Sequence, residues 1–319
     1  MKAWGATDTV AEPKGWTEYA LTAWQERGAS GRANASMREY TTFRIGGPAD
    51  LLLMPRHERD VAFARQLARE LGQPLSIFGA CSNLLVLDGG IRGIVLRTAG
   101  SWESLRVEGG MIRATAGTRL PLLAATARRA GLSGLEFCAV IPGTVGGALT
   151  QNAGAGQQCM ADVFASARVY DEEGRVEQLA PADLAFGHRT SALHGGRATV
   201  LEAEFAGIPD EPERIAARMQ EHRRRRRERL PLSKPSAGSV FRHPGQGHPP
   251  VGLLIEQAGC KGWRCGDAVV SEKHANFIVN EGKAAARDVL DLIARVSEAV
   301  RQTSGLELQS EICIVGDPA

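Results

Sequence analysis

The stretch LEFCAVIPGTVGGALTQNAGAG, residues 135–156, carries five glycines between Gly143 and Gly156. Glycine accepts left-handed backbone angles and lets the chain lie close against another surface. Apolar residues run through the whole stretch without the period of a helix, which indicates a buried loop. A buried loop has peptide groups that need hydrogen-bonding partners, and a bound cofactor could supply them. A tightly packed loop with only a structural role is the alternative.

A second glycine-bearing loop, GACSN at residues 79–83, favours the cofactor interpretation. It is expected to join two strands, residues 75–78 and 84–87, instead of a strand and a helix. The dinucleotide fingerprint and the phosphate loop both require a helix directly after their glycines, so neither motif fits. Consecutive peptide N–H groups, together with Ser82 and Asn83, can still bind a pyrophosphate.

Composition restricts the classes of protein. A chain of 319 residues with 43% hydrophobic residues is long enough for two or three globular domains. A net charge of +2 is too small to indicate nucleic acid or a membrane as the main partner. No stretch reads as a secretory signal or a membrane span, so we expect a cytoplasmic protein. Six cysteines without metal-ligand spacing predict reduced thiols and no metal site.

Periodicity and turn residues predict three groups of elements. The first group has a helix over residues 58–71 and strands at 51–54, 75–78, 84–87 and 91–97, the last two forming a hairpin around residues 88–90. The second group has a hairpin of 105–107 with 111–116, a helix over 120–130, and strands at 164–170, 175–179 and 198–205. The third group has helices over 213–229, 251–258 and 284–303 and strands at 276–279 and 306–315.

Two further segments are interpreted from composition. Residues 1–36 read as a peripheral N-terminal extension with at most a short helix over residues 16–26. The run of five arginines at residues 223–227 reads as a solvated helix face, because no aromatic residue is interleaved for base stacking. Some of these arginines could meet a diphosphate.

Seven strings in this chain, in this order, resemble the family of UDP-N-acetylenolpyruvoylglucosamine reductase (UDP-N-acetylmuramate dehydrogenase), in its shorter form. The strings are TFRIGGPAD (42–50), SNLLV (82–86), IPGTVGGA (141–148), NAGA (152–155), RTS (189–191), PSAGSVF (235–241) and SEKHANFIVN (271–280).

The resemblance implies an α+β protein with a two-lobed FAD-binding fold of the p-cresol methylhydroxylase type and a C-terminal α/β substrate-binding domain. The corresponding ranges are 37–98 and 99–208 for the two FAD-binding subdomains and 209–319 for the substrate-binding domain. FAD, bound non-covalently, would be held by the two loops, and NADPH would be the hydride donor. The implied cofactor residues are Gly79, Ala80, Cys81, Ser82, Asn83, Leu84, Ile141, Pro142, Gly143, Thr144, Gly146, Gly147, Asn152 and Ala153.

The family's three catalytic positions match Arg189, Ser239 and Glu311. A guanidinium at Arg189 suits an enolate and its carboxylate, Ser239 would supply a proton, and Glu311 would be the partner acid. Each residue could instead have a structural role only: Arg189 in a surface ion pair, Ser239 as a turn hydroxyl, and Glu311 as a paired carboxylate on a strand face. The implied contacts to the UDP-sugar or to NADPH are Arg225, Arg242, His243 and His274.

Several positions depart from the family's usual residues. Ala80 and Cys81 stand where glycines are usual, and their Cβ atoms restrict positive φ. The other departures are Gly156, His188, Leu230 and His243. Two alternative functions stay open: a flavin oxidase of the same fold acting on an alcohol or sugar, and a non-catalytic nucleotide- or nucleic-acid-binding descendant.

Overall fold

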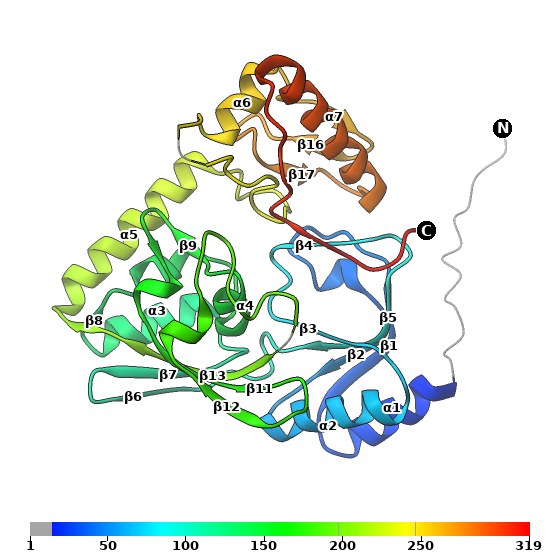
Figure 1. The fold of residues 1–319 in the computed structure, drawn as a ribbon, viewed down its shortest axis with the longest axis vertical. Helices are drawn as coiled ribbons and strands as arrows, with labels where there is room; N and C mark the ends of the chain where they lie inside the picture. Colours follow the sequence, from blue (N-terminus) through cyan, green and yellow to red (C-terminus); the bar gives the residue numbers. More distant parts are fainter. Residues whose placement is uncertain (1–14, 197, 246) are drawn as a thin grey trace.

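The computed structural model describes residues 15–196, 198–245 and 247–319. Two sheet-containing lobes form the lower body in Figure 1, and a third unit with helices α6 and α7 lies above them. Helix α5 (Pro212–Arg229) runs from the second lobe toward the third unit. In the described residues, no helix combines the length and apolar character that crossing a membrane requires.

The first lobe is a four-stranded sheet in the order β1-β2-β5-β3. Strands β2 and β3 both run parallel to β5, and helix α2 makes the crossover between them. Its elements are α1 (Gly15–Gln25), β1 (Ser30–Ser36), η1 (Met37–Glu39), β2 (Pro48–Met54), α2 (Glu58–Glu70), β3 (Leu75–Phe78) and β5 (Ile91–Arg97).

The short helix expected near residues 16–26 is present as α1, but the peripheral extension is wrong for residues 15–36. Strand β1 pairs antiparallel with β2 along its length, and Trp24 is fully buried in the main core. The residues of β1, sequence SGRANAS, are small and polar, so the sequence pattern does not predict a strand there. This edge strand is stabilised by its pairing with β2. Residues 1–14 of the predicted extension lie outside the described residues.

The predicted hairpin around residues 88–90 is also wrong. Strand β4 (Leu84–Val86) pairs in parallel with β18 (Cys313–Val315), near the other end of the chain. The turn residue Gly90 lies against Pro48, where a Cβ atom would come 1.9 Å from the carbonyl oxygen. The turn therefore redirects the chain into β5, and a parallel partner so distant in sequence leaves no local signal.

The second lobe is an antiparallel five-stranded sheet in the order β12-β11-β13-β7-β6. Helix α4 begins inside the glycine-rich stretch, which the sequence analysis read as a loop without a helix. Gly146 permits this helix to lie on Ala116, since a Cβ there would come 3.1 Å from that methyl group. The elements are β6 (Leu105–Glu108), β7 (Met111–Thr115), α3 (Leu120–Arg129), β8 (Leu132–Ser133), η2 (Glu136–Val140), α4 (Val145–Thr150), β9 (Gly154–Ala155), β10 (Gln158–Cys159), η3 (Met160–Asp162), β11 (Phe164–Tyr170), β12 (Val176–Leu179), η4 (Pro181–Leu184), β13 (Thr199–Ala206) and β14 (Ile208–Pro209).

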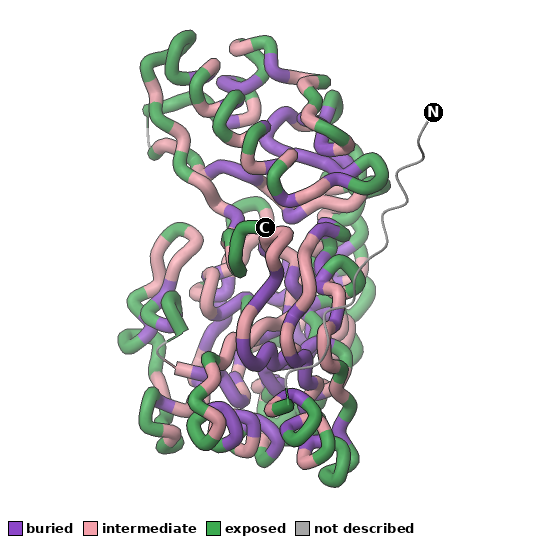
Figure 2. The backbone as a smooth tube through the Cα atoms, turned by 90° about the vertical axis from the view of Figure 1, so that its right-hand side faces the viewer, coloured by how far each residue is buried: buried purple, intermediate pink, exposed green. Residues whose placement is uncertain are grey.

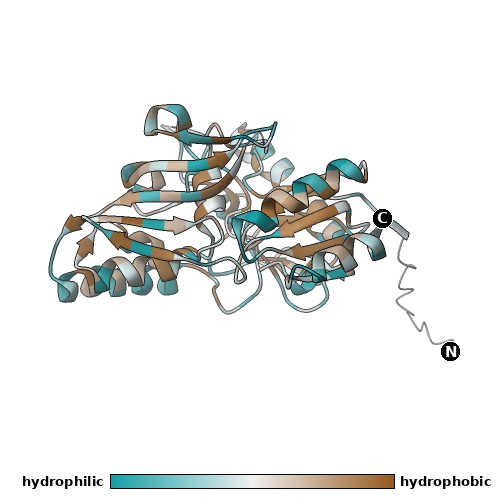
Figure 3. Cartoon of the chain, turned by 90° about the horizontal axis from the view of Figure 1, so that it is seen from below, coloured by the Kyte–Doolittle hydropathy of each residue, from teal (hydrophilic) through white to brown (hydrophobic). Residues whose placement is uncertain are grey.

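The third unit packs two helices on a three-stranded antiparallel sheet. Its elements are α6 (Val251–Gln257), β15 (Arg264–Cys265), β16 (Ala268–Val270), β17 (Ile278–Asn280) and α7 (Ala286–Ser304). The strand expected over 306–315 is only β18, so Glu311 lies just before it. In Figure 3, several strands are coloured as hydrophobic over most of their length, whereas the helices mix hydrophobic and hydrophilic residues.

The cores cross the predicted domain boundaries. One hydrophobic cluster runs through both lower lobes and includes Ile215 and Met219 of α5. A second cluster fills the third unit but takes in Phe43, Ile45 and Leu85 from the first lobe. Figure 2 shows buried segments in both the lower body and the third unit. The three units therefore interlock, and the ranges 37–98, 99–208 and 209–319 stay a prediction.

Candidate active site

A single cavity of about 2190 Å³ lies between the three units. Both glycine-bearing loops line it, as do the three residues expected to be catalytic, Arg189, Ser239 and Glu311. Arg225 and His274 line it as well. Among the expected cofactor residues, Gly79, Ala80, Cys81, Ser82, Asn83, Leu84, Ile141, Pro142, Gly143, Thr144, Gly146, Gly147 and Ala153 face it.

The two loops meet at Gly79 and Thr144. A Cβ atom at Gly79 would lie 2.1 Å from the Thr144 hydroxyl oxygen, so only glycine permits this approach. The Thr144 Oγ1 atom is buried and has no hydrogen-bonding partner among the described residues. Among acceptors of the described residues, none receives a hydrogen bond from the N–H groups of Ala80, Cys81 and Ser82 in the other loop. These groups can bind an oxyanion, so the residues present fit a pyrophosphate-containing cofactor.

Cys81 takes the left-handed conformation, with φ of 53°. Its thiol is buried, and burial raises the pKa of Cys81 to about 11 although the charge of Arg97 opposes the change. The thiol is therefore protonated at neutral pH and packs as an apolar group. Ala80 has no positive φ, so only one of the two departures in this loop strains the backbone.

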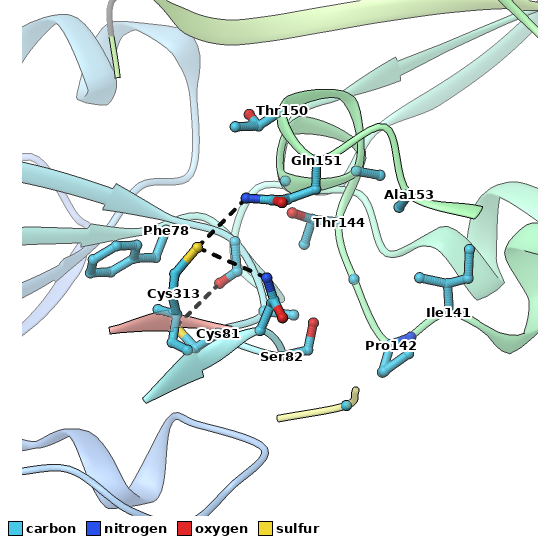
Figure 4. Close-up of a pocket in the computed structure, with 18 of the residues that line it drawn as sticks. Phe78, Cys81, Ser82, Ile141, Pro142, Thr144, Thr150, Gln151, Ala153 and Cys313 are labelled. Carbon is cyan, nitrogen blue, oxygen red and sulfur yellow. Dashed lines mark hydrogen bonds between the residues drawn. The ribbon is translucent and has the colours of Figure 1, made fainter. Parts of the chain in front are cut away.

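Asn83 and Gln151 connect both lobes to the C-terminal strand, and Figure 4 shows the contact between Gln151 and Cys313. The amide nitrogens of both side chains lie near the Cys313 sulfur, at 3.9 Å for Asn83 and 3.6 Å for Gln151. Asn83 Nδ2 also donates to the backbone oxygen of Glu311 over 3.1 Å. Asn83, expected to bind the cofactor, therefore also holds the backbone of Glu311, which is expected to be catalytic.

Arg189 lies at the tip of a tight turn whose ends, Gly187 and Thr190, form a β-bridge. Its φ of 58° is unusual for a residue with a side chain. From this turn, Arg189 Nε donates to Glu311 Oε1 over 2.8 Å. The pair is partly buried, with 31% of the Arg189 side chain and 15% of the Glu311 side chain exposed. A guanidinium and a carboxyl group, 122 residues apart in the chain, thus meet at the cavity.

Ser239 is brought to Glu311 through the backbone. The Glu311 N–H donates to the Val240 carbonyl oxygen over 2.7 Å, and Val240 is the residue after Ser239. On the other side of Glu311, the Cys313 N–H donates to the Asn83 carbonyl oxygen over 2.8 Å. Glu311 is therefore held between the third unit and the first lobe, with Arg189 reaching it from the second.

Asn152 does not line the cavity, and its role as a cofactor residue stays a prediction. Its Nδ2 donates to the Gly187 carbonyl oxygen over 2.9 Å, and its Oδ1 accepts from the Ala161 N–H over 3.0 Å. Both the nitrogen and the oxygen of the side-chain amide therefore have protein partners, and 8% of the residue is exposed.

Arg242 and His243 also lie off the main cavity. Arg242 Nε is buried without a partner among the described residues, and the positive charge of Arg242 acts on the nearby Cys313 thiol. His243 lines a second cavity of about 400 Å³, together with His188. Ser239, His274 and Glu311 line both cavities and separate them.

His274 presents a neutral imidazole. Burial lowers its pKa, and the positive charge of Lys261 acts in the same direction. Its Nδ1 atom is buried and has no partner in the described part of the chain. The ring packs edge-on against Phe277 with centroids 5.1 Å apart.

Two more arginines of α5, Arg226 and Arg229, line the cavity beside Arg225. Arg226 lies in the run that the sequence analysis offered for a diphosphate without singling it out, and Arg229 was missed. Arg225 pairs with Glu221, whereas Arg226 has no acidic partner in the described residues, and burial lowers its pKa. Glu221 and Glu228 hold Arg224 on the outer face of the helix. The helical period separates the residues that face the cavity from those that face solvent. The run of arginines alone does not predict which side of the helix faces the cavity.

Within the described ranges, no group of three or more His, Cys, Asp or Glu side chains could hold a metal ion.

Comparisons with known proteins agree with this geometry. Residues 49–180 match the model of the FAD binding domain, which identifies the class: an FAD-dependent oxidoreductase. Residues 230–315 match the UDP-N-acetylenolpyruvoylglucosamine reductase C-terminal domain. The chain belongs to the UDP-N-acetylenolpyruvoylglucosamine reductase family. The predicted α+β fold class, with a two-lobed FAD-binding fold and a C-terminal domain, is thereby confirmed.

Individual relatives cover nearly the whole chain. The UDP-N-acetylenolpyruvoylglucosamine reductase of Moorella thermoacetica is 46% identical over 89% of this chain and 93% of its own. Reductase 2 of Symbiobacterium thermophilum is 46% identical over 88% and 90%. The crystal structure of the reductase from Thermus caldophilus superimposes with a TM-score of 0.76 at 36% identity, covering 90% of this chain and 98% of that one.

Proposed function

We propose that this protein reduces UDP-N-acetylglucosamine enolpyruvate to UDP-N-acetylmuramate in the cytoplasm, for peptidoglycan precursor synthesis. NADPH is the electron donor, and FAD is held by the loops at residues 79–83 and 141–144. The observation that carries the proposal is that Arg189, Ser239 and Glu311 share the cavity that these loops line. The chemistry that FAD supplies when bound is hydride transfer from NADPH to the enolpyruvyl double bond.

Arg189 binds the substrate carboxylate and stabilises the negative charge that develops beside it. Its guanidinium is permanently charged and can donate two parallel hydrogen bonds. Glu311 orients it through the 2.8 Å hydrogen bond to Nε, which leaves the terminal nitrogens for the substrate. A charge that is already held in place needs no reorganisation when the reaction occurs.

Ser239 donates the proton to the carbon that bears the carboxylate. A hydroxyl is a weak acid, so the proton acceptor has to be strongly basic and held at short range. Glu311 is the partner acid on the same side of the cavity. The diphosphate of the UDP-sugar is best matched by Arg226 and Arg229 of α5, which line the cavity and have no acidic partner among the described residues.

The test separates the two half-reactions. Purified protein should show a flavin absorbance spectrum that NADPH bleaches, and the enolpyruvyl substrate should restore the colour. Ser239→Ala should leave bleaching unchanged and lower product formation by at least about a hundredfold. Ser304→Ala, at the end of α7 and away from the cavity, is the control.

Two outcomes would favour the alternatives. A reduced flavin that reacts quickly with oxygen and ignores the substrate would indicate a flavin oxidase. Colourless protein that takes up no FAD and binds nucleic acid with steep salt dependence would indicate a binding protein.

A further inference from the structure

The turn that carries Arg189 is tied at two points to the C-terminal end of helix α4. Asn152 Nδ2 donates to the Gly187 carbonyl oxygen over 2.9 Å at the start of the turn. Ser191 Oγ donates to the Thr150 carbonyl oxygen over 3.0 Å just after it. Asn152 and Ser191 are both buried, so water competes little for these bonds.

The orientation of the Asn152 amide is fixed. Its oxygen accepts from the Ala161 N–H over 3.0 Å while its nitrogen donates to Gly187. Asn152 itself has φ of 40°, a conformation that asparagine tolerates better than most residues. An aspartate could keep the bond from Ala161 but could not donate to Gly187.

The turn needs such support because its own contacts are few. Gly187 and Thr190 exchange two backbone hydrogen bonds, of 3.0 and 3.4 Å, and the second is long. Arg189 between them has an unfavourable left-handed backbone. A strained residue keeps its conformation only where its surroundings impose it. The two bonds to the end of α4 flank Arg189, and the Ala192 N–H also donates to the Leu184 carbonyl oxygen over 2.8 Å.

We propose that Asn152 and Ser191 are positioning residues that set the place of the Arg189 guanidinium. Both residues link the turn to the C-terminal end of helix α4, which starts directly after Thr144 in the cavity-lining loop. The loop that faces the pyrophosphate and the arginine that faces the substrate are therefore held by the same short helix. The kinetic part of this inference rests on the function proposed above; the structural part does not.

The first experiment measures the turn itself, independently of turnover. Hydrogen–deuterium exchange of the peptide covering residues 184–193 is compared between wild type and Asn152→Gly, in protein with its bound flavin. Glycine keeps the positive φ and removes only the side chain. Exchange at least about fivefold faster supports the inference, and unchanged exchange overturns it. Asn34→Gly, another asparagine with positive φ but in β1, is the matched control.

The second experiment is a double-mutant cycle on product formation, using Asn152→Gly and Arg189→Lys. Asn152→Gly should lower kcat about tenfold or more while NADPH still bleaches the flavin at the wild-type rate. In the Arg189→Lys background it should cost less than about twofold, because the group it positions is gone. Equal losses in both backgrounds would assign Asn152 a general structural role and overturn the inference.

Two further variants sharpen the cycle. Asn152→Asp keeps the acceptor for Ala161 but should lose turnover like Asn152→Gly, and Ser191→Ala should give a smaller loss of the same kind. If wild type does not turn over the enolpyruvyl substrate, the proposed function fails, and the exchange measurement alone decides the inference.

Discussion

Cys81 has a backbone conformation that is unusual for a residue with a side chain. Its φ of 53° is a conformation that glycine adopts freely and that costs a residue with a Cβ atom about 1–2 kcal/mol. The buried thiol packs with Leu84, Val86 and Val95 and offsets part of that cost.

We therefore expect glycine to be more stable than alanine at position 81, the reverse of the usual order. Cys81→Gly should unfold at higher urea concentration than Cys81→Ala, by about 1 kcal/mol in the free energy of unfolding. Cys138, also buried but without a positive φ, is the control site, where alanine should be the more stable. Equal stability of the two variants at position 81 would contradict this account.

At the scale of elements, an ion pair to one buried carboxylate adds to the apolar contacts of Ile215 and Met219 that hold helix α5 on the second lobe. Arg218 Nε donates to Glu136 Oε1 over 2.9 Å, and Ser133 and the Gly134 N–H donate to the same carboxylate. Burial opposes ionisation of Glu136, but these hydrogen bonds outweigh it and lower its pKa. The contact sets the position of the arginines farther along α5.

Arg218→Met should lower the free energy of unfolding by about 2 kcal/mol at pH 7, since Glu136 keeps two of its donors. A carboxyl group with a lowered pKa stabilises the fold fully above its ordinary value near 4.5, and this stabilisation is lost as pH falls through the folded-state pKa. The difference between wild type and variant should therefore shrink below about pH 4.

The control is Arg214→Met, one turn earlier on the same helix. The ion pair of Arg214 in the described residues is with the exposed Glu211, so its loss should cost less than about 0.5 kcal/mol at any pH. Urea titrations from pH 3 to pH 7 measure both variants. Equal losses for the two variants, or a loss for Arg218→Met that does not change with pH, would refute the assigned contact.

Elements with complete local signals were predicted correctly. Helix α2 begins at a capping box and has Gly72 just past its end, and helix α7 has a buried stripe that includes Val289, Val296 and Val300. Strands β1 and β18 and helix α4 depend on partners elsewhere in the chain, so periodicity failed for them. Arg189, Ser239 and Glu311 were predicted from the resemblance to the family. No spacing in the sequence reveals that Arg189 and Glu311, 122 residues apart, share a hydrogen bond.

At the scale of the whole molecule, β18 ties the third unit to the first lobe. It pairs with β4 from Cys313↔Leu84 to Val315↔Val86, directly after Glu311. The position of Glu311 relative to both glycine-bearing loops therefore depends on this short parallel pair.

A chain that ends at Ile312 should keep Glu311 but lose its fixed position. We expect kcat/KM for the enolpyruvyl substrate to fall by at least about a hundredfold, because displacements near 1 Å have effects of that size. Flavin binding, followed by absorbance, should persist. A chain lacking only Ala319 keeps every β18 contact and serves as the control. Wild-type turnover in the shorter chain would show that the strand pair does not position the acid.

The bond from Asn83 to the backbone of Glu311 joins residues 228 positions apart. During synthesis on the ribosome, the first lobe emerges long before β18, so β4 has no strand paired with it during that time. Catalytic competence should therefore appear only once the final segment has left the exit tunnel. During translation, β4 is an unpaired edge that is open to mispairing.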